Sequence, residues 1–375
     1  MTTWARRIAL HNAATRDVGR WRTVRTLDSG APATTVSADG RRVATFASND
    51  YLGLSQNAAV VSAAHAALDR YGTGSGAARL IVGGRPIHDE LEAALAQWCE
   101  RHDALLFPSG YQANVGVIGA LARCAPGLVV FSDELNHASI IDGCRLARAE
   151  IRVFRHADVD HLGELLAEHA PPGSEQPSIV VTDSVFSMDG DRAPLDEIAG
   201  LCASHDTLLV VDEAHAVLAD RPPPGSVVVG TLSKTLGSAG GFVAADRELV
   251  ALCRNTSRSF IFTTAGTPAD TAAALAALEV LRSDEGALLV DRLRANVDRL
   301  APGHDSPILP ILLGDERRAI AVADALLERG VLVPAIRPPT VAPGTCRLRV
   351  AVSAAHTHEQ IDLLRETLDD LGVTW

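Results

Sequence analysis

The chain has 375 residues, 47% of them hydrophobic, which is enough for a large core and indicates two domains rather than one. A formal net charge of −12 argues against broad electrostatic binding to nucleic acid, but it does not exclude a local arginine pocket for an anionic substrate. The six scattered cysteines without metal-ligand spacing, and the lack of a signal-peptide or membrane-spanning pattern, indicate a cytoplasmic protein with no metal site.

The N-terminal part is expected to contain three helices and one hairpin. The helices are predicted at 4–25, 60–70 and 87–102, and the hairpin strands at 34–37 and 42–46, joined across Ala38, Asp39 and Gly40. The glycine-rich stretch 71–79 follows a helix, whereas a dinucleotide-binding fingerprint follows a strand. We therefore do not expect dinucleotide binding.

From residue 104 onward, short apolar strands alternate with helices. The strands are predicted at 104–107, 128–131, 151–154, 179–181, 208–211 and 227–229. This alternation predicts an α/β fold with a mostly parallel sheet between helices, whose ligand site lies at the carboxyl ends of the strands. Polar residues follow five of these ends, at 109–111, 133–137, 183–187, 212–215 and 234.

The character changes near residue 283, where a smaller α+β domain is predicted to begin. Its helices are expected at 288–300, 319–328 and 359–371, and its strands at 308–313, 331–334 and 347–352. We therefore expect an N-terminal arm and hairpin (1–45) packed on the small domain, a large domain (46–282) and a small C-terminal domain (283–375).

Lys234 is the only lysine, since the other 33 of the 34 basic side chains are arginines. Arginine stays charged and cannot supply an amine that condenses with a carbonyl. Compositional drift would also leave a lone lysine, but Lys234 follows an apolar run and lies among hydroxyls and glycines. Such a turn lets a flat cofactor and its phosphate approach the backbone. We therefore interpret Lys234 as the anchor of a carbonyl cofactor.

Three further positions suit a pyridine cofactor. Asp212 ends an apolar run and requires a partner, which a protonated pyridine nitrogen provides. His215 could reach the phenolic oxygen of the ring, and His137 could stack on it or simply face solvent. The helix that Ser109 and Gly110 open has free N–H groups for a phosphate, with a simple N-cap as the alternative.

With these motifs, the chain resembles the α-oxoamine synthase family of pyridoxal-phosphate enzymes, which have the fold type I, aspartate-aminotransferase-like architecture. The resemblance runs from about residue 20 to the C-terminal end. Asp-Glu-Ala-His at 212–215 and Ser-Lys at 233–234 mark the superfamily, while Arg-Pro-Pro-Thr at 337–340 marks the branch of biotin biosynthesis. The other matching stretches are 46–54, 107–114, 183–190 and 343–349.

For the cofactor, pyridoxal 5′-phosphate, the resemblance implies a role for each matching residue. Lys234 binds its aldehyde and later moves the Cα proton, Asp212 holds the pyridine nitrogen, and His137 stacks over the ring. The remaining contacts are Ser187 and His215 at the O3′ side, and Gly110, Tyr111 and Thr231 at the cofactor or its phosphate.

For the substrates, the resemblance implies that Arg349 and Asn49 bind the amino-acid carboxylate. Arg337 and Thr340 border the substrate, and an arginine of the arm, Arg22 or its neighbour Arg20, meets the acyl group. Family members are homodimers with shared sites, so Thr263 or Thr264 is expected to reach the phosphate in the second subunit.

The chain departs from the family pattern at two places. The segment 216–225 after His215 is short, lacks the usual glycine-rich loop and has Ala216 in place of glycine; Ala78 stands where many relatives have serine. These departures bear on substrate reach and loop closure rather than on cofactor binding.

The implied reaction is a decarboxylating condensation of L-alanine with a pimeloyl thioester, carried by coenzyme A or acyl carrier protein. A sister synthase that uses glycine with another acyl-CoA is one alternative. An aminotransferase on the same fold, which releases no coenzyme A, is another. A non-catalytic cofactor-binding protein is a third, supported only by the short segment.

Overall fold

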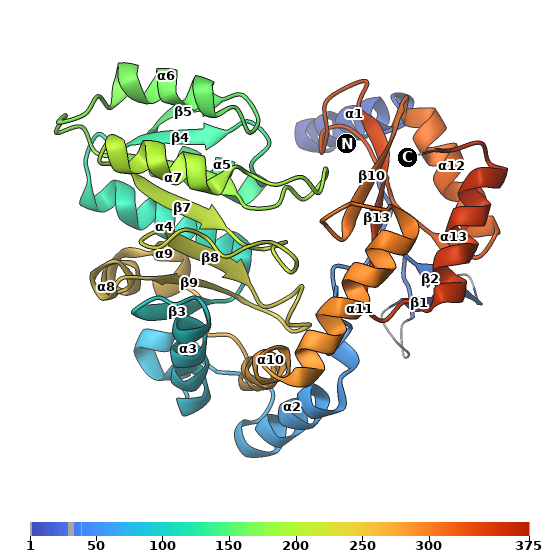
Figure 1. Ribbon diagram of the computed structural model, residues 1–375, viewed down its shortest axis with the longest axis horizontal. Helices are drawn as coiled ribbons and strands as arrows, with labels where there is room; N and C mark the ends of the chain where they lie inside the picture. The colour runs from blue at the N-terminus through green and yellow to red at the C-terminus, as the bar shows by residue number, and fades with distance from the viewer. Residues whose placement is uncertain (1, 29–33, 39, 375) are drawn as a thin grey trace.

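The structure is a computed structural model that describes residues 2–28, 34–38 and 40–374, and it consists of two lobes (Figure 1). The larger lobe is built around a seven-stranded sheet in the order β3-β9-β8-β7-β6-β4-β5. Its strands are β3 (Asp103–Phe107), β4 (Val129–Asp133), β5 (Glu150–Phe154), β6 (Ser178–Asp183), β7 (Leu208–Asp212), β8 (Val227–Thr231) and β9 (Gly241–Ala245).

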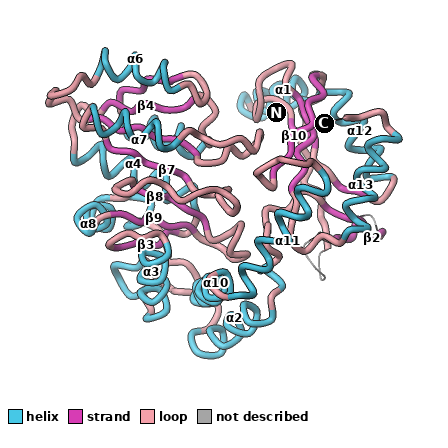
Figure 2. The backbone as a smooth tube through the Cα atoms, in the orientation of Figure 1, coloured by secondary structure: helices cyan, strands magenta, loops and turns pink. Residues whose placement is uncertain are grey.

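Helices cover both faces of this sheet, as Figure 2 shows. One face packs against α4 (Gly110–Cys124), α5 (Ala138–Ala147), α8 (Arg247–Thr256) and α9 (Arg258–Ile261). Part of the other face packs against α6 (Val159–His169) and α7 (Leu195–Ser204). Successive strand residues point to opposite faces, so Val130 joins the first cluster and Phe131 the second. Burial on both faces explains why the strands read as continuous apolar runs.

Further helices continue the large lobe below the sheet in Figure 1. These are α2 (Ala58–Tyr71), the π-helix η2 (Arg79–Gly83), α3 (Pro86–Trp98) and α10 (Pro268–Leu281), with a short 3-10 turn η1 (Leu54–Gln56) before α2. The predicted helix 87–102 is therefore too long, because the chain turns at Glu100, whose φ is 55°.

The predicted strands all exist, but a seventh was missed. β9 lies between β3 and β8 and runs antiparallel to both, while β8, β7, β6, β4 and β5 are parallel. The sequence around β9 begins with two glycines, at positions 240 and 241, and this pattern predicts a turn rather than a strand. Because β3 and β8 are both antiparallel to β9, they run in the same direction and end at the same edge of the sheet.

The smaller lobe is an α+β layer joined through α11 (Asp284–Leu300). It has a sheet in the order β10-β13-β12 and another in the order β1-β2-β11. Its elements are β10 (Ile308–Gly314), α12 (Glu316–Glu328), β11 (Val331–Leu332), β12 (Ala335–Ile336), β13 (Cys346–Ala351) and α13 (His358–Asp370). The two residues of β12 were not predicted.

The N-terminal segment contributes to the smaller lobe. β1 (Thr35–Ala38) and β2 (Arg41–Thr45) form the predicted antiparallel hairpin, and β2 also pairs with β11 in parallel. Asp39, predicted in the turn of the hairpin, lies outside the described residues. The predicted helix 4–25 is wrong beyond α1 (Thr3–Asp17), because Gly19 takes a φ of +69° that breaks the helix.

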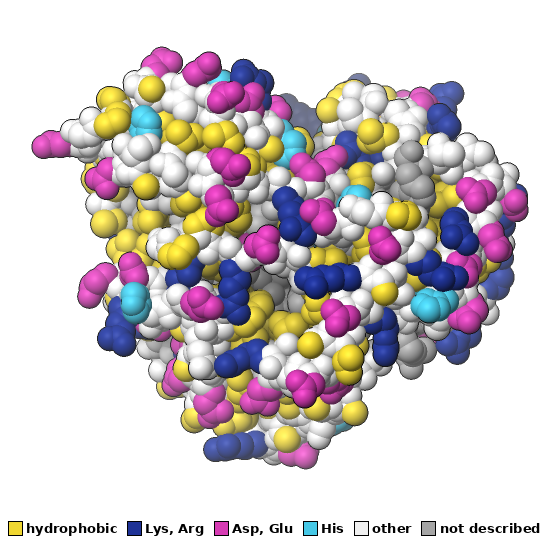
Figure 3. All heavy atoms as spheres, in the orientation of Figure 1, with side chains coloured by type: hydrophobic (Ala, Val, Ile, Leu, Met, Phe, Trp, Pro, Cys, Tyr) yellow, Lys and Arg dark blue, Asp and Glu magenta, His cyan; other side chains and the backbone are white. Residues whose placement is uncertain are grey.

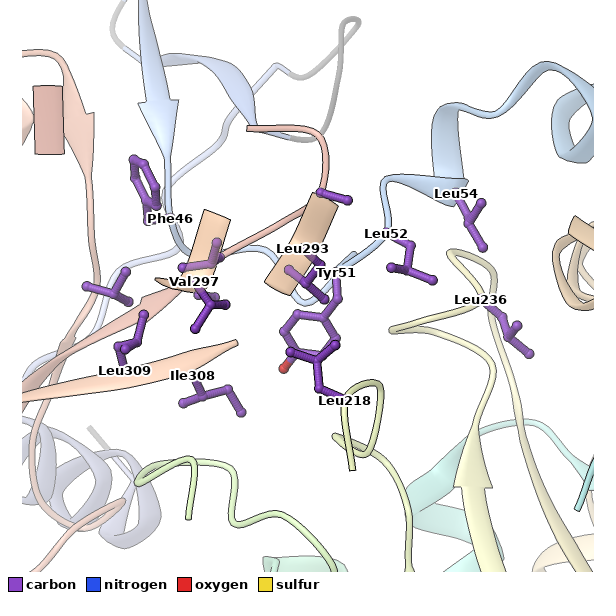
Figure 4. Packing of buried hydrophobic residues seen from close by; sticks show 14 of the residues in the cluster. Phe46, Tyr51, Leu52, Leu54, Leu218, Leu236, Leu293, Val297, Ile308 and Leu309 are labelled. Carbon is purple, nitrogen blue, oxygen red and sulfur yellow. The ribbon is translucent and has the colours of Figure 1, made fainter. Parts of the chain in front are cut away.

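The segment after β2 crosses between the lobes. Figure 4 shows Tyr51 and Leu52 on this crossing, with Leu293 and Ile308 on one side and Leu236 on the other. All five side chains are buried in one cluster, which fastens the small lobe to the edge of the large sheet. In the part of the chain that the structure describes, no helix has both the length and the apolar character needed to cross a bilayer.

Candidate active site

Lys234 lies in the turn between β8 and β9, at the carboxyl edge of the large sheet. Its Nζ is 2.7 Å from Nε2 of His215, and Nδ1 of His215 is 2.6 Å from the hydroxyl of Tyr51. Burial lowers the pKa of Lys234 to about 8, against the opposing charges of Asp212 and Asp183. An amine with this pKa can exchange protons near neutral pH.

The hydrogen bonds around His215 have one consistent direction. Burial first, and then the charge of Lys234, hold the pKa of His215 well below its usual range, so the ring is neutral. Burial raises the pKa of Tyr51 to about 12, and its hydroxyl donates to Oδ1 of Asn49 at 3.2 Å. His215 therefore donates from Nδ1 to Tyr51 and accepts from Lys234 at Nε2.

Asp212 ends β7, is 5% exposed, and lies beside the Lys234 amine closely enough to shift its pKa. One carboxylate oxygen accepts the N–H of Ala214 at 2.9 Å, and the other accepts Nδ2 of Asn114 at 2.6 Å. Two donors fix the orientation of the carboxylate, which suits it to a cationic ring nitrogen.

His137 is the N-cap of α5, and its side chain is exposed at the same edge. Its backbone N–H donates to Asp183 at 2.8 Å, and its Nδ1 lies 2.7 Å from Oγ of Ser139. The ring is thus held at the mouth of the site by the end of β6 and the first turn of α5.

A candidate phosphate cradle lies where α4 begins. The N–H groups of Gly110 and Tyr111 open this helix, so they have no acceptor within it, and Ser109 caps Gln112. Thr231 and Ser233 place two hydroxyls 2.8 Å apart beside Gly110. A Cβ on Gly241 would lie 2.4 Å from the nitrogen of Gly110, so glycine alone permits this approach.

These groups fit pyridoxal 5′-phosphate. The helix start and hydroxyls suit a phosphate, the oriented Asp212 suits a pyridinium, and the amine of Lys234 suits an aldehyde. The neutral His215 lies on the Lys234 side of the same space. No other ε-amine exists in the chain to take the place of Lys234.

Arg349, which is predicted to bind the amino-acid carboxylate, lies on β13. Its two terminal nitrogens are each 3.2 Å from Oδ1 of Asn49, and its Nε donates to the backbone oxygen of Ser187. Arg349 is 5% exposed, so its charge is little screened. Only the backbone carbonyl of Ser187 takes part in this hydrogen bond, not its hydroxyl.

In the described part of the chain, three predicted substrate residues form no hydrogen bond with Arg349 or Asn49. Arg337 donates to the carbonyl oxygens of Gly19 and Trp21, so it holds the arm. Arg22 and Thr340 are exposed. Arg20 is 2.7 Å from Glu316, which engages it elsewhere.

The side chain of Tyr111 also points elsewhere, because its hydroxyl donates to Asp142 at 2.5 Å. Only its backbone N–H belongs to the phosphate cradle.

The short segment after His215 is held in place rather than open. Arg101 donates to the carbonyl oxygens of Ser226 at 2.8 Å and Pro223 at 2.9 Å. A cavity of about 270 Å³ lies beneath the segment, between Trp98 and Phe242.

Sequence reasoning assigned no role to Tyr51, Asn114 or Ser139. Tyr51 and Asn114 stand in stretches that carry the family resemblance, which was the available signal. Their partners are 164 and 98 residues away in the chain, so no local pattern predicts the contacts.

The chain is similar to known proteins over most of its length. The family model for aminotransferase class I and II matches residues 41–368. The 8-amino-7-oxononanoate synthase of Anaeromyxobacter dehalogenans is 48% identical over 349 residues, covering 87% of this chain and 86% of that protein. The synthase of the same name from Alkalilimnicola ehrlichii is 45% identical over 371 residues, with 93% of each chain covered.

Solved structures extend the likeness to the whole chain. A high-resolution structure of SPT with PLP internal aldimine has a TM-score of 0.88 at 29% identity and covers 100% of both chains. The crystal structure of 8-amino-7-oxononanoate synthase from Francisella tularensis has a TM-score of 0.72 at 26% identity, covering 88% of this chain and 98% of that one.

Proposed function

Because the chain belongs to the class I and II aminotransferase family, and within it to the 8-amino-7-oxononanoate synthases, we propose that it condenses L-alanine with a pimeloyl thioester. The products are 8-amino-7-oxononanoate, the free thiol of the carrier and carbon dioxide. It is a pyridoxal-phosphate-dependent acyltransferase of biotin biosynthesis. One observation supports this most strongly: the sole lysine amine lies among Asp212, His215 and the Arg349–Asn49 pair.

Bound at this site, pyridoxal 5′-phosphate withdraws electrons from the Cα of the amino acid. Lys234 anchors the cofactor and, once released, its amine takes and returns the Cα proton, a task that suits a pKa of about 8. Asp212 would hold the ring nitrogen and keep it protonated, and His137 would stack over the ring. Ser187 and His215 would contact the O3′ side, while Gly110, Tyr111 and Thr231 would hold the phosphate.

We assign the substrate carboxylate to Arg349 and Asn49, because a guanidinium binds a carboxylate through two parallel hydrogen bonds. Arg20 is engaged with Glu316, so Arg22 is the better candidate to meet the acyl group. Arg337 acts through the arm, since it holds the carbonyls at Gly19 and Trp21 beside Arg22. Thr340 borders the same approach.

The test is a product assay by mass spectrometry. Purified protein with pyridoxal 5′-phosphate and L-alanine is given pimeloyl-CoA or pimeloyl acyl carrier protein in parallel. We expect the mass of 8-amino-7-oxononanoate with at least one carrier and none from Lys234→Arg. Turnover by Lys234→Arg at the wild-type rate would reject the assignment.

A second candidate is a sister synthase that joins another amino acid to another thioester. It is favoured by the structural match to SPT, whose TM-score of 0.88 exceeds the 0.72 of the Francisella tularensis synthase. Alanine, glycine and serine offered with pimeloyl-, acetyl- and palmitoyl-CoA separate the candidates by product mass. An aminotransferase would release no coenzyme A in any of these reactions.

We also propose a homodimer and a cytoplasmic location. Leu80, Ile81 and Val82 on η2 are 50%, 74% and 69% exposed, and Phe262 is 70% exposed. An apolar surface of this kind suits a protein interface. Thr263 or Thr264, which follow Phe262, would reach the phosphate in the partner subunit. The six cysteines, all in the described part of the chain, are unpaired, which suits a reducing compartment.

We propose the domain division 1–45, 46–282 and 283–375 for the same enzyme. The described contacts of the arm support its docking on the small domain, through Arg20 with Glu316 and through β2 with β11.

A further inference from the structure

Asn114 is a buried side chain of the active site to which the proposed reaction gives no task. It lies on α4 and is 1% exposed. Its Nδ2 lies 2.6 Å from Oδ2 of Asp212 and 2.9 Å from Oγ of Ser139. One amide nitrogen therefore bridges the carboxylate of β7 and the first turn of α5.

Asp212 determines which way this amide faces. Its carboxylate offers only acceptors, so an amide oxygen at 2.6 Å would place two acceptors against each other. The nitrogen must face Asp212, and its two protons go to Asp212 and to Ser139. The amide oxygen has no hydrogen-bond partner in the described part of the chain. A buried carbonyl oxygen without a donor destabilises the folded protein. The fold retains this unfavourable free energy, and the amide nitrogen stays directed at Asp212 and Ser139.

The orientation of the amide sets the direction of the next hydrogen bond. Oγ of Ser139 receives a proton from Asn114, and so its own hydroxyl proton is available for Nδ1 of His137 at 2.7 Å. The backbone N–H of Ser139 points at the same Nδ1 from 3.3 Å. Two donors facing Nδ1 leave no room for a proton on it.

We propose that Asn114 and Ser139 are positioning residues that hold the Asp212 carboxylate and keep His137 as the neutral tautomer with its proton on Nε2. This inference rests on the proposed function only for the place of His137 over the cofactor ring. A neutral imidazole adds no positive charge next to a ring whose protonation Asp212 maintains. The Nε2–H remains as a donor for an oxygen of the substrate.

The proposal explains why α4, α5 and β7 meet at this point. Asp212 would hold the ring nitrogen and His137 would stack on the ring, yet they come from separate elements. Asn114 and Ser139 connect them through three hydrogen bonds. Ser139 is fully buried. The linkage therefore fixes proton positions and orientation together.

The test measures the tautomer directly by NMR of holoenzyme labelled with ¹⁵N-histidine. His137→Gln assigns the signal. In the wild type we expect the pattern of the Nε2–H tautomer, with Nδ1 unprotonated. In Ser139→Ala and Asn114→Ala we expect a mixture that includes the Nδ1–H form. An unchanged His137 signal in both variants, or a protonated Nδ1 in the wild type, overturns the proposal.

Kinetics provide the second readout. The loss of one such hydrogen bond is expected to lower kcat about tenfold, with KM for both substrates nearly unchanged. Ser178→Ala is the matched control, because it removes a buried hydroxyl that bonds Thr207 at 2.7 Å at the opposite end of β6. It should alter neither the His137 signal nor kcat. A KM effect equal to the kcat effect would indicate a general structural role and contradict the proposal.

Failure of the proposed reaction and failure of this inference are distinguishable. The tautomer is read from the protein without substrate, so a different amino acid or thioester leaves it unaffected. Conversely, formation of 8-amino-7-oxononanoate by a wild type with Nδ1 protonated rejects only the positioning role.

Discussion

Lys234 provides a group that no other residue of the chain can replace. Its amine is partly buried and is hydrogen-bonded to His215, which stays neutral because its pKa is held well below the usual range. Burial favours the neutral amine, while Asp212 and Asp183 favour the charged one, and burial is the larger effect. The balance leaves an amine that is largely charged at pH 7 and becomes a base slightly above it.

The single lysine allows this pKa to be measured without interference from other side chains. In the cofactor-free protein, we expect the rate of reductive methylation at Lys234 to rise with pH and reach half its maximum near pH 8, because only the neutral amine reacts. Peptide mass mapping separates Lys234 from the terminal α-amine, and Lys234→Arg is the control. A midpoint near pH 10, as for an exposed lysine, would contradict the enclosed environment.

At the scale of elements, the loop after β6 contacts two arginines that lie on β13 of the small lobe. The carbonyl of Ser187 holds Arg349, and Asp189 pairs with Arg347. The loop is fastened from the other side by His156, whose Nδ1 is 3.0 Å from Asp133 and whose Nε2 is 2.5 Å from Asp191. These two hydrogen bonds raise the pKa of His156 to about 10.

His156→Gln is expected to reduce the free energy of unfolding by about 2 kcal/mol at pH 6.5, because it leaves two carboxylates without their cation. The folded pKa is raised, so this stabilisation is fully present below the unfolded value near 6.5 and is lost as pH rises through about 10. Urea unfolding of wild type and variant at pH 6, 8 and 10 measures the difference.

His102→Gln is the control for His156, since the pair it forms with Asp246 is 72% exposed on both sides. We expect it to change stability by less than about 0.5 kcal/mol. A His156 effect of equal size at every pH would mean that packing, rather than charge, fastens the loop.

The close packing of β9 against the start of α4 is a second contact between elements that shapes the candidate phosphate cradle. Gly241→Ala would drive a methyl group into the first turn of α4, so we expect the Kd for pyridoxal 5′-phosphate to rise at least about tenfold. Gly119→Ala on the same helix has open space and should leave the Kd unchanged while slightly raising Tm. Absorbance titration of the cofactor-free proteins gives both constants. Equal affinities would place the phosphate elsewhere.

For the whole molecule, the site depends on both lobes. The large sheet supplies the amine, Asp212 and the phosphate cradle, while β13 of the small lobe supplies Arg349. On the face shown in Figure 3, basic and acidic side chains both lie along the boundary between the lobes.

The exposed apolar residues of η2 allow the proposed dimer to be tested. Ile81→Asp would place a charge in the proposed interface, so we expect the dissociation constant of the dimer to rise at least about tenfold. Leu146→Asp on α5, where the leucine is 71% exposed, is the matched control and should leave the dimer intact. Sedimentation velocity over a dilution series measures both. A dimer unaffected by Ile81→Asp would place the interface on another face.

The sequence alone was sufficient to predict the alternation of strands and helices and the position of Asp212 and Lys234 at the carboxyl edge of the sheet. The chemistry of Lys234 stays a prediction. Apolar periodicity and turn residues are local properties, so they can be read within a short window of the chain. The scarcity of lysine is likewise visible without a fold. The motif around Asp212 and Lys234 made the family resemblance specific.

Only the tertiary structure decided which side chains share a hydrogen bond. It inserted β9 between β3 and β8, ended α1 at Asp17, and joined Asn114 to Asp212 across 98 residues of sequence. It also turned Arg337 toward the arm, where it donates to the carbonyl oxygens of Gly19 and Trp21. Such contacts depend on how helices and strands pack, and packing is set by the whole core rather than by the residues on either side of a position.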